Sequence, residues 1–265
     1  MAGERRADEL VAEGLRIVAG ARTLVEDATL RVGAGEIVAL VGSSGSGKTV
    51  TARALLGMVP FAPGRVAGRV TLTVDGHTST PETEADFRPL RGRAIGLLWQ
   101  DARAALDPLR TIGTQVLDAA RLAGPVPSRD ALLLAPDGPL ARAGFADPAR
   151  VARLHPHELS GGMAQRAAIA VALARNSRFL VADEPTTGLD PSVQRGILAQ
   201  LSHLAAAGMG LLFITHDLRL LPGFATRVVV MDHGRTVEEA ATTAGLAGAG
   251  RALVEATRKV AGGVL

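Results

Sequence analysis

One short segment constrains this chain more than any other, the glycine-rich run at residues 42–49. Its two glycines, lysine and threonine stand at the offsets of a phosphate-binding loop. Residues 36–41 before it are mostly apolar and predict a buried strand, while residues 48–58 after it predict a helix. This is the context that the motif requires. The candidate phosphate-binding residues are Gly42, Ser43, Ser44, Gly45, Ser46, Gly47, Lys48 and Thr49.

The lysine of this loop is unusual for the chain. Lys48 and Lys259 are the only lysines, and every other basic residue is arginine. A site that needs a compact ammonium rather than a planar guanidinium explains why a lysine stands here. We expect Lys48 to reach the β- and γ-phosphates of a nucleotide and the Thr49 hydroxyl to ligate Mg²⁺. An ordinary glycine–serine turn is the alternative, which the flanking strand and helix disfavour.

Two acidic residues end a second apolar strand. Residues 179–182 are apolar, and Asp183 and Glu184 follow them directly. A phosphate loop needs a metal-binding carboxylate on a neighbouring strand. We therefore expect Asp183 to hold the Mg²⁺ shell and Glu184 to polarise the attacking water. Alone, such a pair is more often a solvated turn.

A second anion site is predicted at residues 159–163, before a helix-forming run at residues 164–174. Ser160, Gly161 and Gly162 place a small hydroxyl and two glycines at a helix start. A capped helix with a flexible entry is the simpler explanation. However, two phosphate-type sites more than 100 residues apart are explained if one nucleotide is shared between two chains.

Composition excludes several classes of protein. The chain has no cysteine, so disulfides, thiolate catalysis and iron–sulfur clusters are excluded. Its net charge of +3 over 265 residues is too small to favour nucleic-acid binding. No apolar run approaches the roughly 18 residues that would span a bilayer, and the first ten residues lack the apolar stretch of a signal peptide. We expect a soluble, cytosolic polypeptide that meets the membrane through a partner.

The order of the predicted elements indicates an α/β fold. Strands are predicted in the first 100 residues, followed by a helical insertion rich in Ala, Leu and Arg at residues 101–174. Strands at 179–182 and 210–215 flank a helix at 193–207, and a last strand is expected at 228–231. Strand–helix–strand order favours a parallel sheet with right-handed crossovers. The tail from residue 238 is rich in Ala and Gly and carries no clear pattern.

Taken together, these motifs resemble the ATP-binding cassette (ABC) ATPase family. They occur in the family's order, with Gln100 after a strand and His216 at the end of another. Gly188-Leu189-Asp190 follows the acidic pair. The resemblance covers about residues 15–239. It implies one ABC ATPase domain over residues 1–265: a P-loop NTPase core at about 10–100 and 175–240 with a parallel sheet and an antiparallel β region, a helical subdomain at about 101–174, and a tail at 240–265.

The resemblance also implies roles for single residues. Gln100 would contact Mg²⁺ or the water and report to a membrane partner, and His216 would sense the γ-phosphate. Two cassettes would pack head to tail around two ATP molecules, so that each ATP meets the phosphate loop of one chain and Ser160, Gly161 and Gly162 of the other. Asp190 would link the two sites across that interface.

Finer details are similar to the peptide and nickel importer branch. These are the methionine Met163 after the two glycines, the run at residues 183–187, and residues 99–101 with 106–108. Two features depart from the family. The chain has no tyrosine and no aromatic residue before Phe61 to stack on adenine, which leaves an aliphatic platform or Arg22. The tail also lacks the branch's His-Pro-Tyr-Thr-like motif.

The resemblance implies partners as well. These are integral-membrane permease subunits, received along residues 101–110, and a second ATPase subunit, with a heterodimer expected and a homodimer as runner-up. A solute-binding protein would act indirectly, and the chain would be peripheral at the cytoplasmic face of the membrane. The alternatives are an exporter subunit, a non-transport ATPase of DNA repair or translation, and a subunit whose nucleotide site is degenerate. The motif details favour import.

Overall fold

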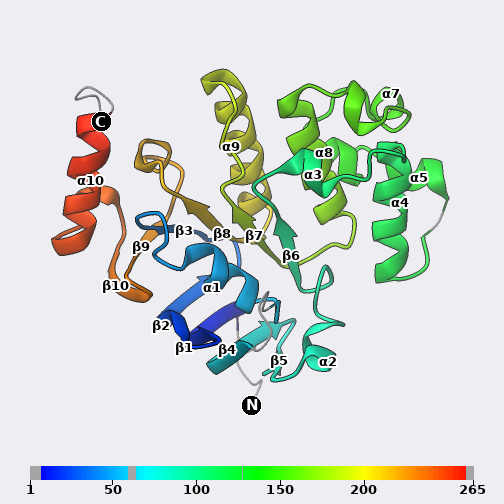
Figure 1. Ribbon diagram of the computed structural model, residues 1–265. Helices are drawn as coiled ribbons and strands as arrows, with labels where there is room; N and C mark the ends of the chain where they lie inside the picture. The colour runs from blue at the N-terminus through cyan, green and yellow to red at the C-terminus, as the bar shows by residue number, and fades with distance from the viewer. Residues whose placement is uncertain (1–6, 59–63, 127, 261–265) are drawn as a thin grey trace, which may run out of the picture. The chain divides into compact units, whose positions relative to one another are not determined.

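The computed structural model describes residues 7–58, 64–126 and 128–260. Its contacts divide the chain into two compact units. The first unit combines Met1–Leu90 with Gly210–Leu265, and the second is Arg91–Met209. Figure 1 labels most of the elements of both. Among the described residues, no helix is long and apolar enough to cross a membrane.

The first unit contains an antiparallel group of strands and a parallel group. Antiparallel pairing joins β1 to β2 and β4, and β4 to β5. Parallel pairing places β3 between β8 and β9, and β10 pairs antiparallel with β9 and at one position with β2. The strands are β1 Glu9–Ala19, β2 Arg22–Gly33, β3 Ile37–Val41, β4 Gly64–Val74, β5 His77–Ser79, β8 Gly210–Thr215, β9 Arg227–Asp232 and β10 Arg235–Ala240.

Burial explains the two kinds of strand. Every residue of β3 and β8 is buried, as expected for parallel strands covered on both faces. β1 and β2 alternate between buried and exposed residues over much of their length, the pattern of strands with one solvated face. Asp75 and Gly76, with φ of 52° and 81°, form the turn that joins β4 to β5.

The helices of the first unit are short except at its C-terminal end. α1 covers Lys48–Ala54, and α2 covers Glu84–Phe87. The helix predicted for residues 48–58 was therefore too long, because Gly57 adopts φ 62° and the Phe87 ring packs against it. The unpredicted tail contains α10, Gly248–Val260. The Glu238 carboxylate on β10 accepts the backbone N–H groups of Ala247 and Gly250 at its start.

The second unit has two parallel strands and seven α-helices among the described residues. β6 (Ile95–Leu98) pairs in parallel with β7 (Phe179–Asp183). The helical insertion predicted for residues 101–174 is present as short helices and one long one, and the helix predicted at 193–207 is α9. The helices are α3 Ala102–Ala105, α4 Ile112–Ala123, α5 Arg129–Leu133, α6 Pro139–Arg142, α7 Pro148–Val151, α8 Gly161–Leu173 and α9 Pro191–Ala206.

Short 3₁₀ turns complete the chain at Pro156–Glu158, Leu218–Leu220 and Thr243–Gly245. The long helix of the second unit, α8, is nearly all apolar and most of its residues are buried, because α3, α4, α6 and α9 contact it. A helix that is apolar all round belongs in a core. α8 is therefore the axis around which the other helices of this unit pack, and its first residues carry the predicted second anion site.

Candidate functional site

The glycines of the phosphate loop are required by the backbone path. The loop leaves the buried strand β3 at Val41 and enters α1 at Lys48. A Cβ at Gly42 would lie 2.1 Å from the Met231 carbonyl oxygen, so no larger residue fits there. Gly47 adopts φ 107° at the start of α1, a conformation that side chains other than glycine rarely adopt. The loop shape predicted from the motif is thus present.

Lys48 is held inside this loop. Its side chain is buried, and Nζ donates to the carbonyl oxygens of Gly42 at 2.9 Å and Ser43 at 2.8 Å. Nζ also lies 3.4 Å from Ser46 Oγ. Around it, Ser43, Ser44 and Gly45 are exposed and Thr49 is half-buried. One positive charge is therefore fixed beneath a loop with exposed residues, which is an arrangement suited to a phosphate chain.

His216 lies at the same sheet edge as this loop. Strands β3 and β8 run in parallel, and Val41 pairs in register with Thr215. The residues that follow each strand, Gly42 and His216, therefore leave the sheet together. His216 is exposed, and next to it Arg219 donates two hydrogen bonds to Asp217, which hold the pKa of that carboxyl below its usual value.

In the second unit, the acidic pair and Gln100 follow the carboxyl ends of two neighbouring parallel strands. β6 and β7 pair in parallel with Leu98 opposite Ala182, so Gln100 and Glu184 each follow two residues later. Glu184 Oε2 accepts hydrogen bonds from Gln100 Nε2 at 3.1 Å and from Thr187 Oγ1 at 2.9 Å. Asp183 is almost fully buried. The three residues predicted around the metal and the water in this unit therefore lie together.

The backbone at Glu184 is strained. Its φ is +46°, a left-handed conformation that costs a residue with a Cβ about 1–2 kcal/mol. Strain of this kind persists where the surroundings over-determine it, and it is most often found at functional sites. The two hydrogen bonds to the carboxylate show which group the strained backbone positions.

The second predicted anion site lies at the start of α8. The Ser160 hydroxyl caps the helix by accepting the Met163 N–H at 3.3 Å, and Ser160 and Gly161 are exposed. Gly162 has a packing role, because a Cβ there would lie 2.4 Å from Val193 on α9. The serine and first glycine face solvent, whereas the second glycine lets two helices approach.

Asp190 is the cap of α9. Its Oδ1 accepts from the Ser192 hydroxyl at 2.6 Å and from the N–H groups of Ser192 and Val193, both at 3.0 Å. The Ser192 hydroxyl bond and these backbone bonds lower the pKa of the Asp190 carboxyl. The family resemblance implied an interface role for this residue, which stays a prediction, and the structure adds its capping role.

A groove of about 450 Å³ in the second unit brings several of these segments together. Gln165 lines it and is a residue that sequence reasoning missed. Its Nε2 is buried and has no hydrogen-bond partner among the residues that the structure describes. Arg103, also at the groove, donates to the Leu159 carbonyl oxygen at 2.8 Å. The groove is lined by Gln100, Asp101, Ala102, Arg103, Gly161, Ala164, Gln165, Thr187 and Leu189.

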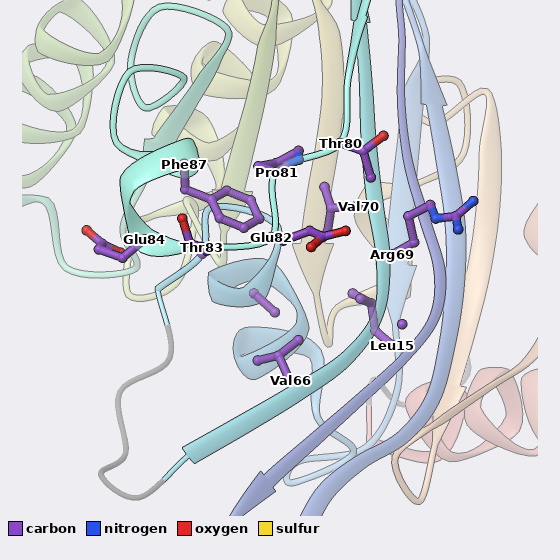
Figure 2. Close-up of a pocket in the computed structure, with 13 residues that line it drawn as sticks. Leu15, Val66, Arg69, Val70, Thr80, Pro81, Glu82, Thr83, Glu84 and Phe87 are labelled. Atoms are coloured by element: carbon purple, nitrogen blue, oxygen red, sulfur yellow. The ribbon is translucent and has the colours of Figure 1, made fainter.

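A separate cavity of about 490 Å³ lies in the first unit (Figure 2). The Phe87 ring forms one wall, and Val66 and Val70 of β4 face it across the space, with Glu82 between them. None of the residues predicted to bind nucleotide or metal lines this cavity. This cavity is therefore separate from the residues that carry the motifs.

Arg22 remains a candidate for contact with the base. It begins β2 and pairs with Ala19 across the turn from β1, and its side chain is exposed. The same strand passes the phosphate loop two residues later, since a Cβ at Gly47 would lie 3.1 Å from the Leu24 carbonyl oxygen. Arg22 therefore lies on β2 two residues before the point where that strand approaches the loop, and its contact with the base stays a prediction.

Comparison with known proteins identifies the family. The ABC transporter family model matches residues 25–187. A putative peptide import ATP-binding protein of Brucella abortus is 43% identical over 238 residues, which is 85% of this chain and 69% of that protein. The nickel import ATP-binding protein NikD of the same species is 39% identical, over 83% of this chain and 80% of its own length.

Among solved structures, an ATP-binding cassette determined as a dimer in a post-hydrolysis state with ADP and Pi has a TM-score of 0.71. It is 25% identical and covers 88% of this chain and 98% of its own. The chain therefore belongs to the ABC transporter family and is an ATP-hydrolysing subunit of that family. The resemblance and the fold class predicted from the sequence are confirmed.

Proposed function

We propose that this chain binds MgATP and, by hydrolysing it, drives the uptake of peptides, nickel or a metal-chelate-type solute through a separate permease. Its similarity to peptide and nickel import proteins over most of its length supports the cargo class. The chemistry rests chiefly on one observation, the strained Glu184 carboxylate held by Gln100 and Thr187 at the end of β7.

The phosphate chain would be bound by the loop. Backbone N–H groups of residues 42–49 and the Lys48 ammonium donate to the phosphate oxygens. Mg²⁺ prefers hard oxygen ligands, and the Thr49 hydroxyl, the Gln100 amide oxygen and the Asp183 carboxylate are of that type. They fit the ion, and we propose that they hold it. When bound, Mg²⁺ neutralises charge on the phosphates as it develops in the transition state.

Glu184 is the proposed general base. The carboxylate accepts a proton from the attacking water as its oxygen bonds to the γ-phosphorus. The bond from that phosphorus to the β,γ-bridging oxygen breaks, which yields ADP and inorganic phosphate. The Gln100 amide orients the carboxylate through its 3.1 Å hydrogen bond. His216, exposed beyond β8, is proposed to sense the γ-phosphate.

A second cassette is proposed to complete the site. The exposed Ser160 and Gly161 at the start of α8 would meet the γ-phosphate bound by another chain, with Asp190 near the same interface. Cassettes of this family dimerise, as the post-hydrolysis structure shows for a relative. We propose a similar but different cassette as the partner, and a homodimer as the alternative.

The membrane side of the proposal concerns the groove lined by residues 100–103. The groove contains the buried Gln165 amide, and a buried donor favours a ligand that brings an acceptor. We propose that a permease helix is received there, that a solute-binding protein acts indirectly through the permease, and that the chain works at the cytoplasmic face of the membrane. Nucleic acid is not an expected partner.

A transport assay in cells tests this function. A strain lacking this gene is complemented with the wild type or with Lys48→Ala, and uptake of ⁶³Ni²⁺ and of a labelled dipeptide is followed. Uptake restored by the wild type and absent in Lys48→Ala is the expected result. Equal uptake in both strains contradicts it, and faster loss of preloaded solute with the wild type would instead indicate export.

A further inference from the structure

Met231, on β9, packs against both ends of the phosphate loop, although it belongs to none of the motifs. It is fully buried, and its backbone and side chain meet different glycines. A Cβ at Gly42 would lie 2.1 Å from the Met231 carbonyl oxygen, and a Cβ at Gly47 would lie 2.8 Å from Met231 Cε. One residue of a neighbouring strand therefore contacts the first and the last glycine of the loop.

The Met231 side chain is itself held by the helix that follows the loop. The Thr51 hydroxyl on α1 donates to Met231 Sδ at 3.7 Å, and Thr51 is also fully buried. The Thr51 N–H donates to the Gly47 carbonyl oxygen at 2.8 Å, in the first turn of α1. Methionine is unbranched and flexible, so a contact at its sulfur restricts where the terminal methyl group lies. The methyl group is thereby kept against Gly47.

The turn after β9 holds the middle of the loop. The Gly234 N–H donates to the Ser46 carbonyl oxygen at 3.0 Å. The Gly234 carbonyl oxygen accepts the N–H groups of Glu26 at 2.7 Å and Asp27 at 3.1 Å, both on β2. Before it, His233 adopts φ 44°, a left-handed conformation that is uncommon for a residue with a Cβ. The end of β9 and its turn therefore connect the phosphate loop to β2.

The tail helix α10 lies on another side of the same loop. A crevice of about 250 Å³ is lined by Ala252 and Leu253 of α10, by Gly42 and Ser43 of the loop, and by Met231. Packed atoms hold a backbone in place, whereas empty space offers no contacts. The contacts of Met231 are therefore a closer support for the loop than α10 is.

We propose that Met231 is a positioning residue for the nucleotide phosphates, because its side chain holds Gly47 at φ 107° at the start of α1. This inference rests on the proposed function. A loop held in its binding conformation spends less free energy on ordering when the phosphates bind. Removing the methionine side chain leaves an empty volume beside Gly47 and Thr51, into which the loop can relax. Phosphate binding should weaken as a result.

The first experiment measures MgADP binding to the purified chain by calorimetry. Met231→Ala is compared with Met209→Ala, the matched control, since Met209 is a second buried methionine and lies at the end of the second unit. Both changes create a cavity and should lower thermal stability. We expect Met231→Ala to bind MgADP about tenfold to a hundredfold more weakly, as misplacement by about 1 Å can. Met209→Ala should bind as the wild type does, and equal affinities in the two variants overturn the proposal.

The second experiment uses a milder change that preserves the fold. Met231→Leu keeps a buried apolar side chain of similar size, but it ends one bond nearer the backbone and does not reach the position of Cε. Loop contacts that act in the ground state and the transition state alike affect KM and not kcat. In the complex isolated from cells, Met231→Leu should therefore raise the KM for MgATP and keep the wild-type kcat. A lower kcat at unchanged KM would indicate a merely structural role and overturns the proposal.

The wild type and Lys48→Ala are measured alongside to separate this inference from the proposed function. A wild-type chain that binds MgADP no better than Lys48→Ala rejects the proposed function. Wild-type binding that is matched by Met231→Ala and Met231→Leu rejects only the positioning role of Met231.

Discussion

Replacing Glu184 by glutamine separates binding from chemistry at this site. Both donors to the carboxylate, Gln100 Nε2 and Thr187 Oγ1, reach the same oxygen, Oε2. A glutamine can present its amide oxygen to both donors, so the side chain keeps its place. The strained φ of +46° is also unchanged, because glutamine and glutamate bear the same Cβ. We therefore expect the free energy of unfolding to change by less than about 0.5 kcal/mol.

The effect on rate should be large. A positioned general base accelerates a reaction about 10²- to 10⁴-fold, which corresponds to roughly 3–5 kcal/mol of barrier. Phosphate release by Glu184→Gln at saturating MgATP should fall by that factor, while the affinity for a fluorescent ATP analogue stays the same. Glu13→Gln, an exposed carboxylate on β1, is the control and should hydrolyse ATP at the wild-type rate.

Two results would refute this reasoning in different ways. Near-normal turnover by Glu184→Gln would place the base at another residue. Loss of nucleotide binding in the same variant would mean that the carboxylate holds the loop or the metal instead of the water.

Three further predictions concern the base, acid stability and assembly. Because stacking on an aromatic residue is worth about 1–3 kcal/mol per base and none precedes the loop, GTP should compete with ATP to within about tenfold. Burial raises the pKa of Glu36, but the bidentate Arg227 bond at 2.8 and 3.0 Å and the Gly33 N–H together lower it below its usual value. Stability from this pair is therefore present above the unfolded pKa of about 4.3 and is lost as pH falls. In urea titrations Arg227→Met should be less stable at pH 7 and lose less on acidification. The Glu184→Gln chain with MgATP should elute as a monomer by size exclusion unless a neighbouring cassette is co-expressed, and a tight homodimer would contradict the heterodimer.

The parts of the site that depend on local sequence could be predicted. The phosphate loop, the acidic pair and His216 each follow an apolar strand directly, and parallel strands end at a common sheet edge. Register then brings Gly42 beside His216 and Gln100 beside Glu184. The phosphate loop and the acidic pair were found from these local patterns, whereas Gln100 and His216 were singled out through the family resemblance.

The parts that depend on tertiary contacts could not be predicted. Nothing local in the sequence shows that the Gln115 side chain bonds to the backbone of Asp107, or that Gln165 Nε2 is buried without a hydrogen-bond partner in the part of the chain that the structure describes. The tail helix α10 was missed although its sequence is amphipathic, because the tail was treated as a stretch rich in alanine and glycine and its helical periodicity was not examined. Its start is fixed by Glu238, which belongs to another element.

The strain at Glu184 supports its role independently of any resemblance. Residues with φ near +46° are preferentially glycine or asparagine, since these avoid most of the steric cost. A chain with no chemical need at this position would lose nothing by using one of them. Glutamate instead accepts the strain, and two neutral donors, the Gln100 amide and the Thr187 hydroxyl, aim its carboxylate.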